Sequence, residues 1–277
     1  MSKFDFKRAK AEAQKAMKSP LLQLVILGSQ GAGKSYTIGT LGVKTLYLYG
    51  TREDHGPKTA NVKGAGNIDP VCFDAVDGKQ LSADDALAAL NSILTDVDYI
   101  KSEGYKAIAI DGLAVLESIV KDSTAFKEKC KTTGGKHNSF LETGAAQDLI
   151  GGIINQLKAL QRELSLHIVV TGILDVKAVD GFGAIEEATP RLSSYGLAES
   201  LNQHFADIIV VGKMTKNGES QHRIQFMSDL TKASKDEHGN IKRAMNFSPR
   251  LSGCDVPSTM PANLAELAKF KRDKMGA

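Results

Sequence analysis

The segment 28–35, with the sequence GSQGAGKS, constrains this chain more than any other. It fits the pattern G-x-x-x-x-G-K-[S/T], a loop whose backbone N–H groups wrap a phosphate. The apolar run LLQLVILG directly before it predicts a buried strand, and residues 34–41 predict a helix. A glycine-rich loop between a strand and a helix is the setting in which this pattern binds phosphate. We therefore predict a nucleotide-binding α/β domain.

The residue types in this loop suit a bound nucleotide with its metal ion. Glycines let the backbone approach a phosphate at positions where a Cβ would obstruct it. Lys34 can bring its ammonium group to the β- and γ-phosphates, and the Ser35 hydroxyl can bind Mg²⁺. We therefore expect ATP and Mg²⁺ as ligands. The predicted nucleotide contacts are Gly28, Ser29, Gln30, Gly31, Ala32, Gly33, Lys34, Ser35 and Tyr36.

A carboxylate is needed to hold the metal ion, and a second group must orient or deprotonate water. The apolar run AIAID ends in Asp111, the pattern of a metal-holding Walker B strand. Glu53 and Asp54 follow a second predicted strand, at the carboxyl end where parallel sheets bind ligands. Glu53 is the first choice for the base, Asp54 the second and Glu117 the third. The competing interpretation is that Glu53 and Asp54 are loop acids without a catalytic role.

The order of the predicted elements indicates a mainly parallel sheet with helices on both faces. Residues 82–104 read as one helix capped by Ser82, whereas 50–70 read as a loop and 175–200 as irregular. The segments ADIIVVGKM and HRIQFMSDL predict an antiparallel hairpin around an Asn-Gly turn, which extends the sheet. We expect a basic helix in 1–18, the core in 19–250 and a tail with a short helix in 251–277.

The net charge of +3 is unevenly distributed. Residues 1–18 hold six Lys or Arg and two Asp or Glu, and residues 212–277 hold twelve and seven. The remaining middle part is acidic, so the basic ends are either nucleic-acid contacts or solvated faces. The chain shows neither an apolar run near the ~18 residues of a membrane span nor an apolar signal segment. Its three cysteines are far apart, which predicts free thiols in the cytoplasm.

With strand, P-loop, acid after the second strand, Asp111 and Thr171 in this order, the chain resembles the RecA-like ATPase core. It looks most like the small phage-encoded P-loop ATPases related to RecA and RadA that serve in recombination and single-strand annealing. The resemblance covers roughly residues 19–270. The matching phrases are LVILGSQGAGKS, AIAIDGLAVLES, LETGAAQDLIGGIINQLKALQRELSLHIVVTGIL and MPANLAEL. It implies phosphate and metal contacts from Gly28, Gly33, Lys34 and Ser35, Asp111 as the Walker B acid and Glu53 as the catalytic carboxylate.

The resemblance also implies partners: single-stranded DNA, further copies of the chain in a ring or filament, and a single-strand-binding protein. The ATPase would then be DNA-stimulated and, if a phage encodes it, would work in the host cytoplasm. The expected DNA loops are 122–142, which carries Lys127, Lys129, Lys131 and Lys136, and 174–194. In the second loop Phe182 either stacks on a base or anchors the loop on the core, and Glu186 and Glu187 oppose DNA binding. Candidates for a basic residue that completes a neighbour's ATP site are Lys232, Lys235, Arg191 and Arg223.

Two residues leave roles open. Thr171 either senses the γ-phosphate with its hydroxyl or satisfies a local backbone group. Gly112, not Glu, follows Asp111, which departs from the AAA+ pattern. Other P-loop functions remain as alternatives: a DNA packaging motor, a helicase loader, or a small-molecule kinase, which would need a lid with clustered arginines. A non-enzyme alternative is a structural or interaction protein that holds ATP without turning it over.

Overall fold

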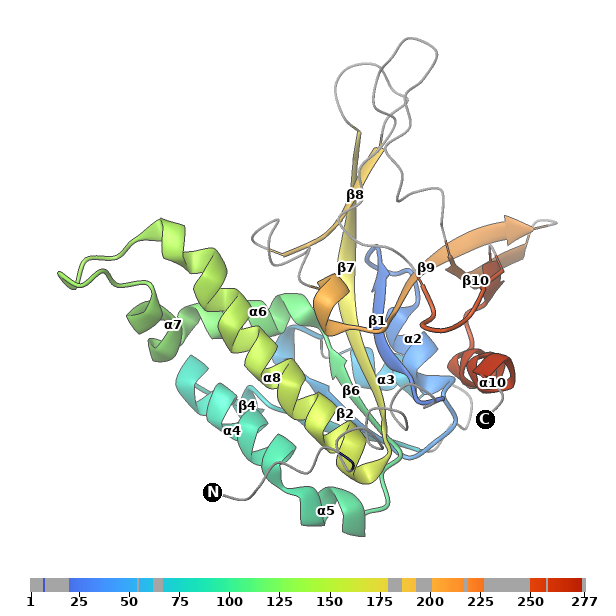
Figure 1. The fold of residues 1–277 in the computed structure, drawn as a ribbon, viewed down its shortest axis with the longest axis horizontal. Helices are drawn as coiled ribbons and strands as arrows, with labels where there is room; N and C mark the ends of the chain where they lie inside the picture. Colours follow the sequence, from blue (N-terminus) through green and yellow to red (C-terminus); the bar gives the residue numbers. More distant parts are fainter. Residues whose placement is uncertain are drawn as a thin grey trace.

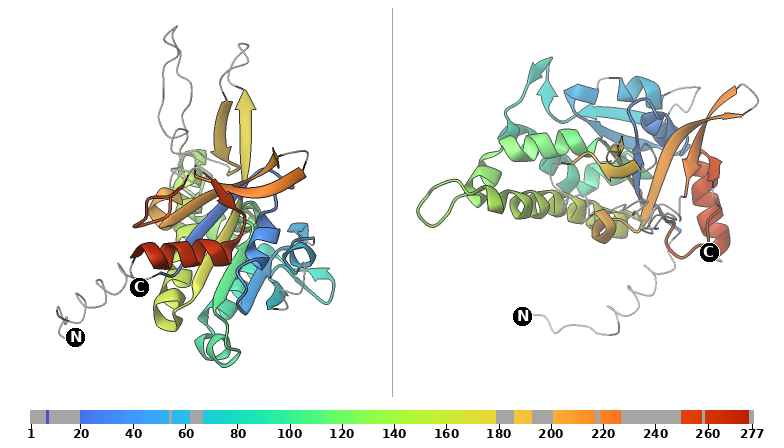
Figure 2. Two further views of the ribbon diagram at one scale, coloured as in Figure 1. Left: turned by 90° about the vertical axis from the view of Figure 1, so that its right-hand side faces the viewer. Right: turned by 90° about the horizontal axis from the view of Figure 1, so that it is seen from above.

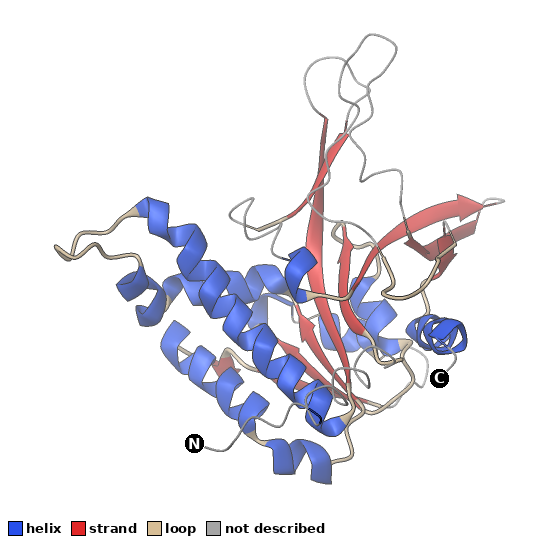
Figure 3. Cartoon of the chain, viewed as in Figure 1, coloured by secondary structure: helices blue, strands red, loops and turns tan. Residues whose placement is uncertain are grey.

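The computed structural model describes residues 7, 20–53, 55–61, 67–178, 186–192, 201–216, 219–226, 250–257 and 259–275. These residues form a mostly parallel sheet with helices packed on both faces (Figures 1 and 3). The predicted α/β class is therefore confirmed. Several predicted features lie outside the described residues: the helix in 1–18 apart from Lys7, and Asp54, Phe182, Lys232 and Lys235.

The main sheet has the strand order β11-β10-β9-β1-β7-β6-β2-β3. Neighbours from β9 to β3 are parallel, whereas β10 and β11 extend the β9 edge antiparallel. β8 pairs only with β7, antiparallel, and β4 with β5 forms a small separate sheet. The strands are β1 (Gln23–Gly28), β2 (Thr45–Tyr49), β3 (Ile68–Cys72), β4 (Ala75–Val76), β5 (Lys79–Gln80), β6 (Ala107–Asp111), β7 (His167–Ala178), β8 (Glu186–Pro190), β9 (Asp207–Lys216), β10 (Glu219–Gln225) and β11 (Thr259–Pro261).

Two hydrophobic cores flank the sheet, because the strands alternate side chains between its faces. One core joins the sheet to α4, α6 and α8, and the other joins it to α2, α3 and α10 (Figure 2). No helix among the described residues has the length and apolar character needed to cross a membrane. The α-helices are α2 (Lys34–Gly39), α3 (Gly56–Ala60), α4 (Ala83–Thr95), α5 (Val97–Ser102), α6 (Leu113–Asp122), α7 (Thr124–Lys129), α8 (Glu142–Leu164) and α10 (Leu264–Met275), with 3-10 turns η1 (Thr51–Glu53) and η2 (Ser139–Leu141).

Three sequence-based expectations need correction. The single helix over 82–104 is wrong, because it divides into α4 and α5 at Asp96, whose carboxylate accepts a hydrogen bond from the Tyr99 N–H at 3.0 Å. The expected loop over 50–70 contains η1 and α3 and ends in β3. The irregular segment after residue 174 is in part a ribbon, since β7 continues to Ala178 and pairs with β8. The Ser82 cap and the β9–β10 hairpin are confirmed.

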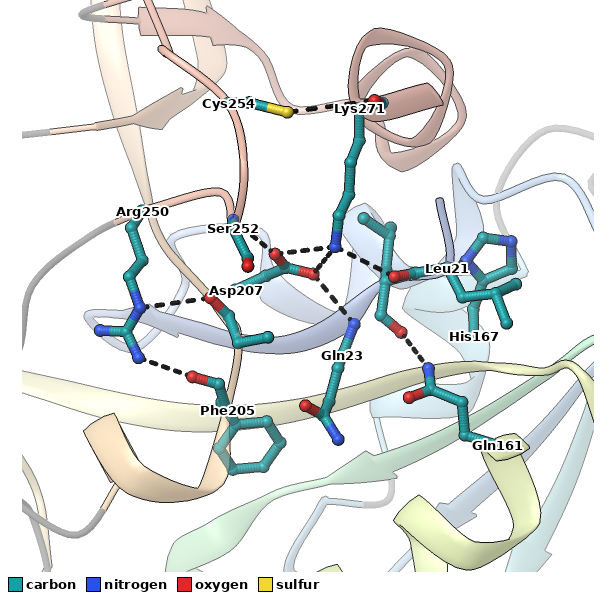
Figure 4. Close-up of polar contacts among 12 residues, drawn as sticks. Leu21, Gln23, Gln161, His167, Phe205, Asp207, Arg250, Ser252, Cys254 and Lys271 are labelled. Carbon is teal, nitrogen blue, oxygen red and sulfur yellow. Dashed lines mark hydrogen bonds and ion pairs between the residues drawn. The ribbon is translucent and has the colours of Figure 1, made fainter. Parts of the chain in front are cut away.

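A buried ion pair attaches α10 to the amino-terminal ends of β1 and β9 (Figure 4). Lys271 Nζ lies 2.7 and 3.0 Å from the two carboxylate oxygens of Asp207 and donates to the Leu21 carbonyl at 3.0 Å. Asp207 also accepts from the backbone N–H groups of Gln23 and Ser252. Both charged side chains are almost fully buried, at 4% and 0% exposure. The two charges therefore depend on each other, since water can solvate neither.

Lys271→Met should lower the free energy of unfolding by about 3–5 kcal/mol, because it leaves the Asp207 carboxylate buried without its counter-charge. Adding Asp207→Asn should restore part of the loss, since no unpaired charge then remains. Urea denaturation followed by circular dichroism measures both changes. Lys269→Met, at an exposed position of the same helix, is the control. A loss as large in the control would show that the effect comes from α10 and not from the ion pair.

Candidate functional site

The predicted P-loop connects β1 to α2 at the carboxyl end of the parallel strands. Gly31 and Gly33 have φ values of 76° and 94°, left-handed conformations that favour glycine. Lys34 begins α2, and its Nζ donates to the carbonyl oxygens of Gly28 and Ser29, each at 3.0 Å. These contacts fold the lysine side chain back over the loop. Its ammonium group is therefore held at the centre of the turn that the glycines form.

Asp111, the last residue of β6, joins the P-loop helix to two other strands. Its buried carboxylate accepts hydrogen bonds from the hydroxyl groups of Ser35 on α2, Tyr47 on β2 and Thr171 on β7. The Ser35 Oγ to Asp111 Oδ2 distance is 2.7 Å. Burial, followed by the negative charge of Asp111, raises the pKa of Tyr47 above its ordinary value, so this phenol remains a donor. The Thr171 hydroxyl thus donates to Asp111.

Glu53 lies beside Lys34 and Asp111 at the end of η1. Burial raises the pKa of its carboxyl, the Asp111 charge raises it further, and Lys34 opposes the shift. Burial also lowers the pKa of Lys34, against the opposing charges of Asp111 and Glu53. The third candidate base, Glu117, is buried on α6 and is not among the residues that line the cleft described below.

Asp74 fixes the turn that carries Glu53, and sequence reasoning missed it. Its buried carboxylate accepts hydrogen bonds from the Thr51 N–H at 2.8 Å and the Thr51 hydroxyl at 3.1 Å. The Glu53 N–H in turn donates to the Gly50 carbonyl at 2.8 Å. Glu53 is therefore placed by a short structured turn at the end of β2, held from outside by the segment that follows β3. For Asp74, the signal in the sequence was its position as an acid after a short apolar strand.

His222 on β10 contacts the P-loop from the side of the sheet opposite to β2 and β6. Sequence reasoning missed this residue too. Its Nδ1 donates to the Ala32 carbonyl at 2.7 Å, and its ring lies 5.9 Å from the Tyr36 ring, centre to centre. A Cβ at Gly33 would come within 2.5 Å of Nδ1. Gly33 is therefore required both by its φ value and by the imidazole against it. The partner strand β9 brings Lys213 into register with His222.

One cleft of about 770 Å³ is lined by the P-loop together with Glu53, Asp111 and His222. Four basic side chains line it, Lys34, Arg52, Arg191 and Lys213, together with two acidic ones, Glu53 and Asp111. The positive excess suits a polyanion such as a triphosphate. Of the predicted nucleotide contacts, Gln30, Gly31, Gly33, Lys34, Ser35 and Tyr36 line the cleft, whereas Gly28, Ser29 and Ala32 form the adjoining backbone.

The donor set fits a magnesium ion that arrives with a nucleotide. Mg²⁺ prefers oxygen ligands and is usually held by one or two carboxylates plus phosphate oxygens and water. Ser35 Oγ and the Asp111 carboxylate provide adjacent oxygen atoms at the mouth of the P-loop. Among the described residues, no group of three or more His, Cys, Asp or Glu could hold a metal by itself. The two oxygen donors, Ser35 and Asp111, suit a metal ion that takes its other ligands from a phosphate and water.

Among the described residues, those predicted for DNA binding or for a neighbouring subunit lie away from the P-loop or have partners within the chain. The segment between α6 and α8 forms α7 and a loop at the far end of the molecule from α2 and α10 (Figure 1). There Lys129 pairs with Asp148 at 3.0 Å and Lys131 with Glu128 at 2.5 Å, all at exposed positions. Arg223 donates to Thr259 on β11. Arg191 lines the cleft of its own chain.

Compared with protein-family models and with curated proteins, the chain matches none of them.

Gly56 leaves the space that the Tyr47 hydroxyl and the Asp111 carboxylate occupy, so a substitution there tests the packing of the site. A Cβ at Gly56 would lie 2.6 Å from the Tyr47 hydroxyl and 2.8 Å from an Asp111 carboxylate oxygen. Gly56→Ala should therefore lower the free energy of unfolding by about 1–3 kcal/mol. Gly152→Ala is the control, because a Cβ there meets open space within α8 and should stabilise the helix by about 0.5–1 kcal/mol. Equal effects in denaturation experiments would contradict this account.

Proposed function

We propose that this protein binds ATP with Mg²⁺ and hydrolyses it. The observation that carries the proposal is convergence: Lys34, Ser35, Asp111 and Glu53 come from three separate parts of the chain and line one cleft. Their chemistry is complementary, since an ammonium group and a basic lining suit phosphates while the oxygen donors suit a metal ion. A glycine turn with an incidental Lys-Ser pair would not require the buried carboxylate that Ser35 contacts.

Each residue has a defined task in the reaction. Lys34 donates hydrogen bonds to β- and γ-phosphate oxygens and stabilises the charge that develops there. Ser35 and Asp111 would hold the metal ion, which when bound would neutralise phosphate charge. A water oxygen forms a bond to the γ-phosphorus while the bond from phosphorus to the β–γ bridging oxygen breaks, and its electron pair leaves with ADP. Glu53 accepts the proton that the attacking water loses.

The arrangement of the strands supports a RecA-like core within the broader α/β class. β7, which carries Thr171, lies between the P-loop strand β1 and the Asp111 strand β6. β2, which leads to Glu53, lies on the far side of β6. The strand that follows the P-loop helix therefore brings its acid next to Asp111. This spatial arrangement is compatible with the order along the chain on which the resemblance to RecA-like ATPases rests. The phage recombination family is part of this proposal.

Single-stranded DNA is the proposed partner, bound by the segment from α7 to α8. The Phe140 ring is 93% exposed there, and a solvated aromatic ring offers a surface on which a base can stack. Four lysines precede it in the sequence: Lys127, Lys129, Lys131 and Lys136. The exposed ion pairs of Lys129 and Lys131 are each worth only about 0–1 kcal/mol, so DNA phosphates can replace the carboxylates. A homo-oligomer would place several such segments along one strand.

Lys34→Ala should abolish ATP turnover and weaken nucleotide binding without changing the fold, because Lys34 packs over the loop and not in a core. Phosphate release measures turnover, calorimetric titration measures binding, and circular dichroism reports the fold. Lys101→Ala, at an exposed position of α5, is the charge-matched control. Unchanged turnover in Lys34→Ala would refute the assignment of this cleft. Tight ATP binding by a wild-type protein that shows no turnover would favour the nucleotide-holding alternative.

Glu53→Gln should keep ATP binding but slow hydrolysis by about 10²-fold or more, as loss of a positioned base does. The base must be deprotonated to act, so wild-type turnover should fall as pH drops through the pKa of Glu53. Because that pKa is raised, the fall should occur above the ordinary range of a glutamate. The acid limb should disappear in the variant and persist in the exposed control Glu163→Gln. If Glu53→Gln keeps full turnover, the base is another residue.

Single-stranded DNA should bind more tightly with a non-hydrolysable ATP analogue and should stimulate turnover. Replacing Lys127, Lys129, Lys131 and Lys136 together by Ala should flatten the dependence of log affinity on log salt, because fewer counterions are released. Phe140→Ala should lower affinity by about 1–3 kcal/mol, the typical value of one stacked base. Tyr99→Ala, at an exposed position of α5, is the aromatic control. Fluorescence anisotropy at several salt concentrations measures these affinities. Absence of binding at low salt would favour a packaging, loading or kinase role.

A further inference from the structure

Arg191 follows β8 and lies in the same cleft as the P-loop lysine. Its backbone N–H donates to the Ile173 carbonyl at 2.7 Å, which fixes the chain at this point beside β7. Its guanidinium binds Asp175 through two hydrogen bonds, from Nε at 2.7 Å and from Nη2 at 2.5 Å. The side chain is nevertheless 55% exposed and faces the cleft, so it remains accessible to a ligand there.

The charge of Arg191 acts on the ammonium group of Lys34. It contributes to lowering the pKa of Lys34, which places the guanidinium within electrostatic range of the ammonium group. Two cations that face the same space repel each other until an anion lies between them. A terminal phosphate held by Lys34 would supply that anion. Arg52 lies on the η1 side of the cleft, where its Nη1 is 3.4 Å from the Ser118 hydroxyl.

The bidentate contact with Asp175 indicates how such a residue could change partners. A guanidinium presents a planar fork of donors that matches a carboxylate and a phosphate equally well. The Asp175 carboxylate is 28% exposed, so water can solvate it if the arginine leaves. Because both partners reach solvent, separating them leaves no charge buried without water.

We propose that Arg191 acts in cis: it leaves Asp175 to bind the γ-phosphate of the nucleotide in its own chain's cleft and stabilises charge there during hydrolysis. The inference rests on the proposed ATPase function and deepens it. An arginine beside the transferred phosphoryl group can come from the same chain or from a neighbour, and in either case it accelerates the reaction strongly. Here the same chain supplies the arginine, and Asp175 binds its guanidinium beside the site until the nucleotide is present.

Substitutions of the two partners should have opposite effects on binding. Arg191→Ala should lower turnover by about 10²-fold or more and weaken binding of a non-hydrolysable ATP analogue while leaving ADP affinity nearly unchanged. Asp175→Asn should strengthen binding of the analogue, because no carboxylate then competes for the guanidinium. Arg162→Ala, at an exposed position of α8, is the matched control and should change nothing. If both substitutions weaken analogue and ADP binding alike, the pair is only a structural brace and the proposal is wrong.

Mixing two inactive variants distinguishes action in cis from action in trans. Lys34→Ala subunits keep Arg191 but lack the phosphate-binding lysine, whereas Arg191→Ala subunits keep the lysine. If Arg191 served a neighbouring site, mixed assemblies would regain turnover, and that result would overturn the proposal. We expect no recovery at any mixing ratio. Wild-type protein without ATP turnover would instead refute the proposed function, whereas active wild-type protein with fully active Arg191→Ala would refute this inference alone.

Discussion

The buried carboxylate of Asp111 is the contact on which the rest of the site depends. It accepts hydrogen bonds from hydroxyl groups on α2, β2 and β7, so one side chain fixes the P-loop helix relative to two strands that flank β6. A carboxylate has about four acceptor positions, and three hydroxyl donors leave room for one further ligand. Neutral donors stabilise the charge without cancelling it. The negative charge therefore remains available to a cation at the mouth of the P-loop.

Asp207 is another buried carboxylate, but its charge is compensated in a different way, and the contrast separates a structural role from a functional one. Asp207 lies at the amino-terminal ends of the strands and is neutralised directly by Lys271, with two backbone donors completing its contacts. Such a saturated pair stabilises the position of α10 and leaves no capacity for a ligand. Asp111 lies at the opposite, carboxyl ends, where a parallel sheet binds its ligands. A buried charge held only by hydroxyl groups in a cleft is accordingly the better functional candidate.

The sequence was sufficient to predict an element wherever a local pattern determined its secondary structure. The second predicted strand, before Glu53, forms β2, and the apolar run ending in Asp111 forms β6. Expectations were wrong where a single side chain overruled periodicity, as Asp96 does when it caps α5 and interrupts an otherwise continuous helix. They were also wrong where pairing with another strand, and not the local sequence pattern, determined the structure, as in the β7–β8 ribbon. Tyr47, Gly56 and His222 join the site only through tertiary contacts, and one sequence does not show which distant strands come together.

The two sides of the cleft come from different parts of the sheet. Glu53 and Asp111 come from the parallel strands β2 and β6, whereas Lys213 and His222 come from the antiparallel hairpin β9–β10 on the other side of β1. The magnesium–triphosphate that we propose as the ligand would use both sides, because the metal ion needs oxygen donors and the phosphates need cations. The antiparallel hairpin also reaches α2 twice: His222 holds the loop before it, and β11, paired with β10, leads to Leu264, whose N–H donates to Thr40 at the helix end. The side of the cleft that carries Lys213 and His222 is thus built on the same unit that positions the P-loop helix.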